Sequence, residues 1–169
     1  QAAATLIFVG YDVNSPSDNI AAFISGVKTS TVAQGKTQVG MMRFSMWTKE
    51  LQGVISNITV NRVGSEGANA EITGVRLFLD TNGDKILEPG NDTEITDNTV
   101  APSTFNSINT TILNIKHKTI HGLINTTTKY FYVTYDFSDS ADAGNRHAAS
   151  IGGEGVALVD GTMASFSAM

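Results

Sequence analysis

The chain has 169 residues, of which 41 % are hydrophobic and 16 % are charged, and its formal net charge is −5. Thr, Ser, Asn and Gly take the place of charged residues, and these types suit strands and turns better than helices. The acidic balance argues against nucleic-acid binding, which needs a basic surface. The sequence has no cysteine and therefore no disulfide framework, and no apolar run reaches the roughly 18 residues of a membrane-spanning helix.

Alternation of apolar and polar residues predicts β-strands along most of the chain, and helical periodicity is nearly absent. The predicted strands cover residues 39–48, 54–63, 73–79, 110–115, 129–137, 155–159 and 163–166. Only residues 20–24 are expected to form a short helix. Many short strands separated by turn residues predict an antiparallel β-sandwich, jelly-roll or immunoglobulin-like, with roughly seven to ten strands.

The same alternation assigns side chains to the core. Strand 54–63 is expected to point Val54, Ile58 and Val60 inward. The inward residues of two further strands are Met42, Phe44 and Met46, and Phe131, Val133, Tyr135 and Phe137.

The first 12 residues differ from the rest because both faces of the strand they would form are apolar. The outer face of a sandwich strand is normally wetter, so this segment needs cover on both sides. We divide the chain into an N-terminal apolar strand, residues 1–12, that can be donated to a neighbour, and a β-sandwich domain, residues 13–169. A central strand capped by a loop is the alternative. The apolar residues concerned are Leu6, Ile7, Phe8 and Val9.

The most specific motif is residues 80–92, Asp-Thr-Asn-Gly-Asp-Lys-Ile-Leu-Glu-Pro-Gly-Asn-Asp. Calcium takes about six to eight oxygen ligands, which closely spaced acidic and amide residues around a tight turn can supply. Lys85 stands where an EF-hand loop has Gly, and the incoming flank is strand-like, so the loop is not an EF-hand. An Asn-Gly turn with acidic neighbours is the alternative. The predicted structural calcium ligands are Asp80, Asn82, Asp84, the Ile86 carbonyl, Glu88 and Asp92.

Other chemistry-bearing residues are given simpler interpretations. His117 and His121 have a spacing that suits zinc only on a helix, and we expect exposed polar positions instead. Four further acidic residues suggest a second metal site or the carboxylate pair of a glycoside hydrolase, but we expect a solvated acidic loop instead. The acidic residues of that cluster are Asp136, Asp139, Asp142 and Glu154.

Outward aromatic residues offer a second function. Trp47, Tyr130 and Tyr132 alternate away from the predicted core, and such rings on a β-sandwich can stack on sugars. The alternative is that they cover a second face or cross-strand neighbours.

The sequence also indicates where the protein acts. It begins with Gln1 and lacks a basic and apolar leader, as expected of a secreted chain after signal-peptide removal. Four Asn-X-Ser/Thr triplets suit glycosylation at an extracellular or cell-surface location, although an Asn- and Thr-rich chain also produces them by chance. The four acceptors are Asn57, Asn91, Asn109 and Asn125.

Two segments carry a resemblance to a known family. Residues 77–84, Leu-Phe-Leu-Asp-Thr-Asn-Gly-Asp, and residues 130–136, Tyr-Phe-Tyr-Val-Thr-Tyr-Asp, are followed by Ala141, Ala143 and Gly144. With these motifs, residues 32–151 resemble a domain that recurs in surface proteins of bacteria and archaea. The resemblance implies an extracellular β-sandwich with a calcium loop and, by itself, no activity.

An apolar strand ahead of such a sandwich resembles subunits of archaeal bundling pili and TasA-type biofilm fibres, in which a strand of one subunit completes the sheet of the next. The resemblance implies head-to-tail homopolymerisation. We therefore expect a calcium-stabilised structural subunit of an extracellular filament, pilus or surface layer, and not an enzyme. The alternative is a monomeric secreted carbohydrate-binding or adhesion module that recognises surface glycans.

Overall fold

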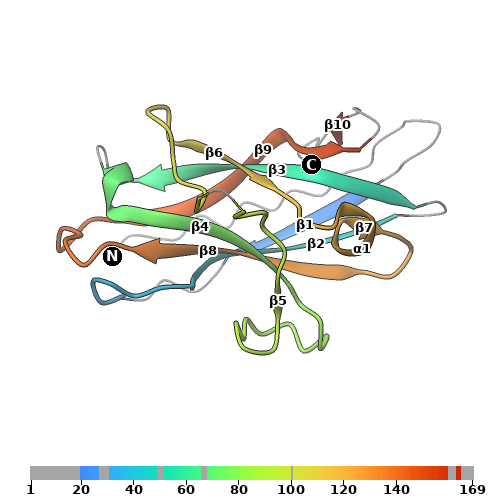
Figure 1. The fold of residues 1–169 in the computed structure, drawn as a ribbon, viewed down its shortest axis with the longest axis horizontal. Coiled ribbons are helices and arrows are strands. Elements are labelled where there is room, and N and C mark those ends of the chain that lie inside the picture. Colours follow the sequence, from blue (N-terminus) through green and yellow to red (C-terminus); the bar gives the residue numbers. More distant parts are fainter. Residues whose placement is uncertain are drawn as a thin grey trace.

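The protein is a β-sandwich of two antiparallel sheets, one packed on the other (Figure 1). The computed structural model describes residues 20–26, 31–48, 52–65, 68–99, 101–159 and 163–164. The predicted donor strand, with Leu6, Ile7, Phe8 and Val9, lies outside these residues. The fold class predicted from the alternation pattern is confirmed.

Each sheet has five strands. The first sheet runs in the spatial order β1 (Ile20–Gly26), β2 (Val39–Thr48), β8 (Lys129–Phe137), β4 (Ile72–Leu79) and β5 (Thr93–Glu94). The second sheet runs in the order β10 (Met163–Ala164), β9 (His147–Leu158), β3 (Gly53–Gly64) and β6 (Thr110–Asn114), and β7 (Leu123–Ile124) pairs with β3. A 3₁₀ turn, η1 (Ala68–Glu71), precedes β4, and one α-helical turn, α1 (Lys118–His121), precedes β7. Among the described residues, no helix is long and apolar enough to cross a membrane.

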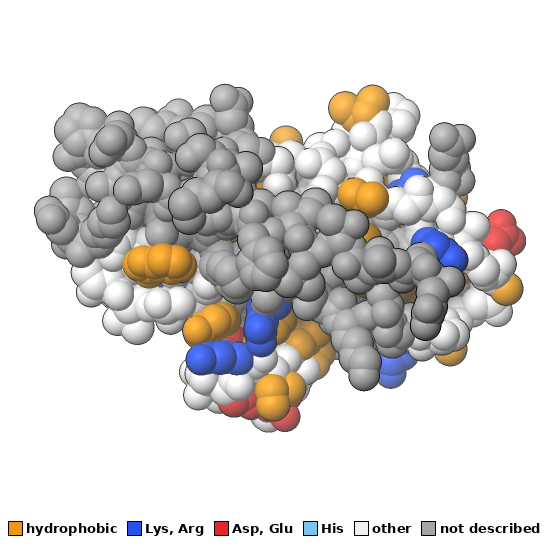
Figure 2. Space-filling view, turned by 180° about the vertical axis from the view of Figure 1, so that it is seen from behind, with side chains coloured by type: hydrophobic (Ala, Val, Ile, Leu, Met, Phe, Trp, Pro, Cys, Tyr) orange, Lys and Arg blue, Asp and Glu red, His pale blue; other side chains and the backbone are white. Residues whose placement is uncertain are grey.

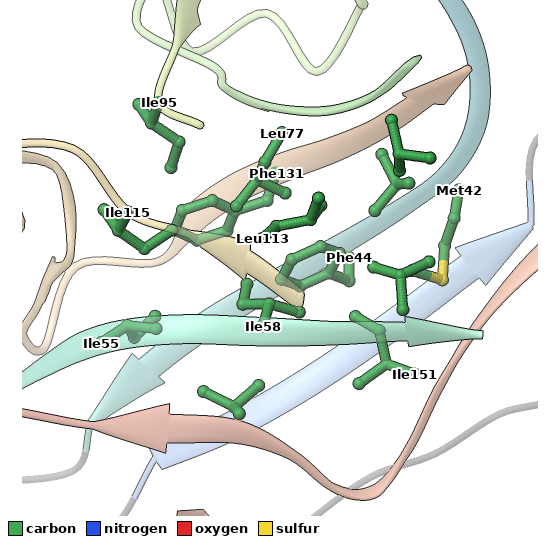
Figure 3. Close-up of a cluster of buried hydrophobic side chains, with 14 of the residues drawn as sticks. Met42, Phe44, Ile55, Ile58, Leu77, Ile95, Leu113, Ile115, Phe131 and Ile151 are labelled. Carbon is green, nitrogen blue, oxygen red and sulfur yellow. The ribbon is translucent and has the colours of Figure 1, made fainter. Parts of the chain in front are cut away.

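The core lies between the sheets and is built by the predicted inward faces (Figure 3). Phe44 of β2 stacks on Phe131 of β8 with ring centroids 5.2 Å apart. From the second sheet, Ile58 and Leu113 pack against them. Because these side chains are almost fully buried, the core supplies the main hydrophobic stabilisation of a chain that has no disulfide.

A β-bulge changes the predicted face of one residue. The pairing of β3 with β9 shifts register between Ile55 and Asn57, so the side-chain alternation is offset by one position there. Ile55 is buried in the core and Val54 is only half-buried. The prediction was wrong for Val54 and is confirmed for Ile58 and Val60.

The predicted short helix at residues 20–24 was also wrong. This segment is strand β1, which pairs antiparallel with β2 from Ile20 opposite Thr48 to Gly26 opposite Met42. Isoleucine and phenylalanine favour strands, and the edge of β2 offers a row of backbone hydrogen bonds. Pairing with β2 therefore overrides the weak local pattern.

Candidate metal loop

The predicted calcium loop connects β4 to β5 and is held in shape by its first residue. Asp80 Oδ1 accepts a hydrogen bond from the Gly83 amide at 2.7 Å, and Asp80 Oδ2 accepts one from the Lys85 amide at 2.9 Å. Gly83 and Lys85 both have left-handed backbone conformations, with φ of 79° and 64°. Lys85 thus adopts the backbone region for which Gly is normally selected, and the loop turns tightly without Gly at that position.

Three other predicted ligands meet around one amide group. Asn82 Nδ2 donates to Asp84 Oδ2 at 3.0 Å and to Glu88 Oε2 at 3.2 Å. Asp84 Oδ1 accepts the Ile86 amide at 2.8 Å. The fold therefore brings together two carboxylates that lie four residues apart in the sequence.

Asp92 closes the loop from its buried side. Asp92 is only 7 % exposed, and its Oδ2 atom accepts a hydrogen bond from the Glu88 amide at 2.8 Å. The other oxygen, Oδ1, is buried and has no hydrogen-bond partner among the described residues. Burial raises the pKa of Asp92 and outweighs the lowering effect of the Glu88 and Thr81 backbone amides, and the charges of Asp80 and Asp84 raise it further. A buried, unpaired carboxylate oxygen near two other acids is the environment that a bound cation would stabilise.

The loop folds back onto the outer face of the first sheet, which is the face turned away from the second sheet. Arg43 Nη1 of β2 donates to the Lys85 carbonyl at 3.1 Å, and Lys85 Nζ lies 5.1 Å from the centre of the Tyr130 ring of β8. A Cβ atom on Gly40 would lie 3.0 Å from Leu87 Cδ2, so Gly40 leaves room for the loop. Figure 2 shows acidic side chains, in red, at the end of the projection at the bottom of the view, with basic side chains, in blue, just above them.

Tyr132 lies on this covered face, opposite Arg43 in the pairing of β2 with β8. The residue is 3 % exposed and its hydroxyl is buried without a hydrogen-bond partner among the described residues. Burial raises the pKa of Tyr132 to about 12, and the negative charges of Asp80, Asp92 and Asp84 contribute to the rise. The Tyr132 hydroxyl is therefore a second buried oxygen without a partner among the described residues, and the acidic residues of the loop act on it electrostatically.

The predicted sugar-stacking surface is reduced by this arrangement. Trp47 and Tyr130 are half-buried, whereas Tyr132 is closed off from solvent. The three aromatic rings do belong to the outer face, as alternation predicted. Tyr132, however, cannot present a ring to a sugar while the loop covers it.

As the loop stands, its acidic side chains are engaged with backbone and amide groups. No three acidic or histidine side chains of the described residues converge on a single point suited to an ion. A calcium shell here would also draw on neutral oxygens, namely the Asn82 amide and the Ile86 carbonyl. To bind an ion through Asp84 Oδ2 and Glu88 Oε2, the loop would have to give up the hydrogen bonds from the Asn82 amide to both oxygens and from the Asn91 amide to Glu88.

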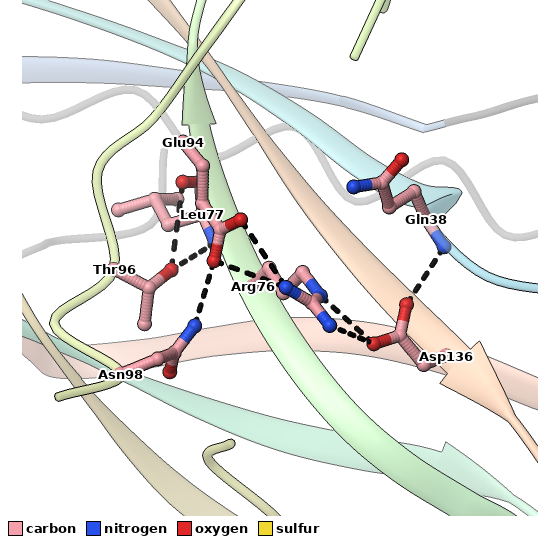
Figure 4. A network of polar contacts seen from close by, with 7 residues as sticks. All are labelled: Gln38, Arg76, Leu77, Glu94, Thr96, Asn98 and Asp136. Atoms are coloured by element: carbon pink, nitrogen blue, oxygen red, sulfur yellow. Dashed lines mark hydrogen bonds and ion pairs between the residues drawn. The ribbon is translucent and has the colours of Figure 1, made fainter. Parts of the chain in front are cut away.

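Among the described residues, the members of the second acidic cluster do not converge on a metal site. Asp136 is 4 % exposed, and its Oδ2 accepts hydrogen bonds from Arg76 Nε at 2.8 Å and Nη2 at 2.6 Å (Figure 4). Its Oδ1 accepts the Gln38 amide at 2.8 Å. Asp139 and Asp142 lie on exposed turns, and the side chain of Glu154 lies outside the described part. Asp136 therefore belongs to a structural ion pair, which also includes Glu94 on the other side of Arg76.

A buried Glu–His pair was not predicted. Glu71 Oε2 lies 3.0 Å from His147 Nε2, and Glu71 Oε1 accepts the Asn145 side-chain amide at 2.6 Å. Burial lowers the pKa of His147, against the opposing effect of Glu71. Burial alone would raise the pKa of Glu71, but hydrogen bonds from Asn145, Asp142 and His147 lower it on balance. No sequence motif links residues 71 and 147, so this contact is evident only from the folded structure, in which η1 and the start of β9 meet.

The four glycosylation acceptors differ in how free their side-chain amides are. Asn91 is exposed, but its Nδ2 donates to Glu88 Oε2 at 2.9 Å. Asn57 Nδ2 donates to Ser56 Oγ at 3.3 Å. Asn109 and Asn125 are half-buried, and each accepts a hydrogen bond through its Oδ1 atom, from Arg62 and from the Thr127 amide. Modification of these residues stays a prediction.

Protein-family models and curated proteins were compared with the chain, and neither comparison gave a match.

Proposed function

We propose that the protein is a calcium-stabilised structural subunit of an extracellular assembly whose subunits are joined by strand donation. One observation carries the calcium part of the proposal. Asp92 is buried in a loop with three other acidic residues, and its Oδ1 atom has no partner among the described residues. A bound divalent cation would pair this oxygen and offset the repulsion from Asp80 and Asp84.

The position of the loop supports a structural role for the ion. The loop contacts β2 through Arg43 and β8 through Tyr130, so an ion that fixes the loop also fixes the cover of the first sheet. A ligand that binds only the folded state stabilises that state by mass action. Calcium is therefore expected to raise the free energy of unfolding rather than to take part in a reaction.

Terbium luminescence tests the location of the ion. Tb³⁺ binds oxygen-rich calcium sites, and its emission is sensitised when an excited tyrosine lies nearby. We expect sensitised emission from the full chain, its displacement by Ca²⁺, and its loss in Asp92→Asn. The Tyr132→Phe variant should keep the ion but give weaker emission. Emission that is unchanged by Asp92→Asn would place the ion elsewhere.

The sheet edges support assembly by strand addition. Among the described strands, β6 and β10 lie at the two ends of the second sheet, and β1 and β5 lie at the two ends of the first. An outermost strand has backbone groups available for a further strand. At the two ends of β6, the carbonyls of Thr110 and Asn114 already accept the Asn106 and Asp97 amides, so a further strand would pair along the middle of β6. Ile108, just before β6, and Ile112, within it, are 75 % and 56 % exposed and place apolar side chains beside this position. We assign the β6 edge as the acceptor for the apolar residues Leu6, Ile7, Phe8 and Val9 of a neighbouring subunit.

Electron microscopy of full-length variants tests strand donation. The wild-type protein is expected to form uniform fibres, and Phe8→Asp or Ile112→Lys is expected to give discrete particles. Ile120→Lys is the matched control, because Ile120 is also exposed, at 66 %, but lies on α1. Fibres that survive both Phe8→Asp and Ile112→Lys would contradict assembly through this strand and edge.

A further inference from the structure

His117 immediately precedes α1, and His121 is the last residue of α1, the only α-helical turn among the described residues. The sequence pattern predicts strand and turn here, where a spacing of four residues does not bring two side chains together. Instead, the amides of Ile120 and His121 donate to the His117 carbonyl at 2.8 Å and 3.0 Å. This closed turn brings the two histidines near each other.

The two rings are close enough to share an ion. Their centroids lie 6.0 Å apart, with an angle of 60° between the planes. Metal–nitrogen bonds of about 2.0–2.1 Å place each imidazole centroid roughly 3.2 Å from the metal, so two rings on one ion have centroids at most about 6.4 Å apart and about 5 Å apart in tetrahedral geometry. Tetrahedral binding would require the exposed His117 side chain to bring its centroid about 1 Å closer to that of His121.

The His117 side chain starts from an unusual backbone conformation and makes no capping hydrogen bond. His117 has a left-handed backbone conformation, with φ of 49° and ψ of 56°, and its side chain makes no capping hydrogen bond. Such a conformation is uncommon for residues other than Gly and often marks a functional position. Among the described residues, no side-chain hydrogen bond engages either ring, and His147, the third histidine of the chain, is instead paired with Glu71.

The donor atoms, and not the surrounding charges, indicate the kind of ion. Lys116 and Lys118 flank His117, and Lys129 Nζ donates to the Leu123 carbonyl at 2.7 Å. These positive charges oppose any divalent cation, and Ca²⁺ and Mg²⁺ in addition lack the oxygen ligands that they need. Imidazole nitrogens instead form strong bonds with borderline transition metals, whose affinity depends less on neighbouring carboxylates.

We propose that His117 and His121 form a two-imidazole surface site for a divalent transition metal of the zinc and copper class, with solvent completing its coordination. This site lies on α1, apart from the loop between β4 and β5, and does not depend on the proposed calcium function. It would anchor α1 by joining the residue before the helical turn to its last residue.

Titration of the full-length chain with Zn²⁺ in excess Ca²⁺ at pH 7.5 tests the site. Calorimetry is expected to show one Zn²⁺ per chain, with affinity at least tenfold lower in His117→Gln and in His121→Gln. Thr119→Ala, at an exposed position of the same helical turn, is the control, and its Zn²⁺ affinity should equal that of the wild type. In the wild-type protein, Zn²⁺ should shift the NMR signals of the His117 and His121 rings and leave those of His147 unchanged. Absence of Zn²⁺ binding, full binding by both histidine variants, or shifts only at His147 would overturn the proposal.

Discussion

Asp92 and Asp136 show how environment separates two buried aspartates. Asp136 is neutralised by Arg76 and accepts a backbone amide, so all of its charge is accounted for within the fold. Asp92 has one backbone amide on Oδ2 and no partner for Oδ1 among the described residues. Buried charges are normally paired or bound to a metal. The contrast supports a structural role for Asp136 and is the basis on which we propose Asp92 as a ligand.

The Arg76–Asp136 pair gives a prediction for stability. Arg76→Met leaves a buried carboxylate without its partner, which we expect to lower the free energy of unfolding by about 2–4 kcal/mol. Glu94→Gln removes the second, more exposed partner of Arg76 and should cost less than about 1 kcal/mol. Denaturant unfolding of both variants measures the difference. Equal losses would contradict the assignment of Asp136 as the main partner.

The Glu71–His147 pair predicts that acid destabilises the protein. Burial lowers the pKa of folded His147 below its ordinary value of 6.5, so the unfolded chain binds that proton more readily and stability falls as the pH drops below about 6.5. The pKa of Glu71 is also lowered from 4.5, so its contribution is present above that pH and is lost below it. Thermal unfolding of wild type and His147→Gln between pH 7.5 and 5 should show a smaller loss in the variant. A parallel decline in both proteins would exclude His147 as the cause.

Among the elements, the end of β3 depends on one glycine. Gly64 has φ of 135°, and a Cβ atom there would lie 1.9 Å from the Arg146 carbonyl oxygen. We expect Gly64→Ala to destabilise the fold by at least about 2 kcal/mol, because both the backbone conformation and the contact with β9 oppose a side chain. Gly90→Ala, where a Cβ atom meets nothing within 4 Å, is the control and should change stability by no more than about 0.5 kcal/mol. Equal stability of the two variants would show that the contact at Gly64 relaxes freely.

The elements also show what sequence patterns can and cannot predict. Strands β2 and β8 were predicted with their observed bounds, because ten and nine residues of alternating pattern leave little ambiguity. Strand β1 and the bulge beside Ile55 were missed, since both depend on pairing partners far away in the sequence. The long strand β9 was predicted only at its end, because its first half is rich in Ala, Ser and Gly and has no apolar alternation.

The candidate site was predicted in part for the same reason. Asp80, Asn82, Asp84 and Glu88 are close in sequence, and a local motif is enough to gather them. The cover that the loop forms over Tyr132 needs contacts with Arg43 and Tyr130, which no local pattern encodes. The helical turn at His121 is likewise set by its packing beside β7 and β3, and its neighbours alone favoured a turn.

At the scale of the whole molecule, contacts join the loop of residues 80–92 to the sandwich. The loop ties β4 and β5 to the outer face of β2 and β8, and the core joins that sheet to β3 and β6. An ion in the loop would therefore stiffen the first sheet, while the β6 edge of the second sheet stays available for a neighbouring strand. Under the proposed function, calcium would stabilise a subunit from a position apart from the proposed assembly edge.

Thermal unfolding of the full-length wild type and Asp92→Asn, in calcium and in a calcium chelator, tests the calcium claim most directly. Calcium at about 100 times its dissociation constant should stabilise the wild type by about 2.7 kcal/mol, which corresponds to a rise in Tm of about 5–11 °C for a chain of this size. The Asp92→Asn variant should show little or no rise. Identical melting curves of the wild type in calcium and in chelator would contradict the account.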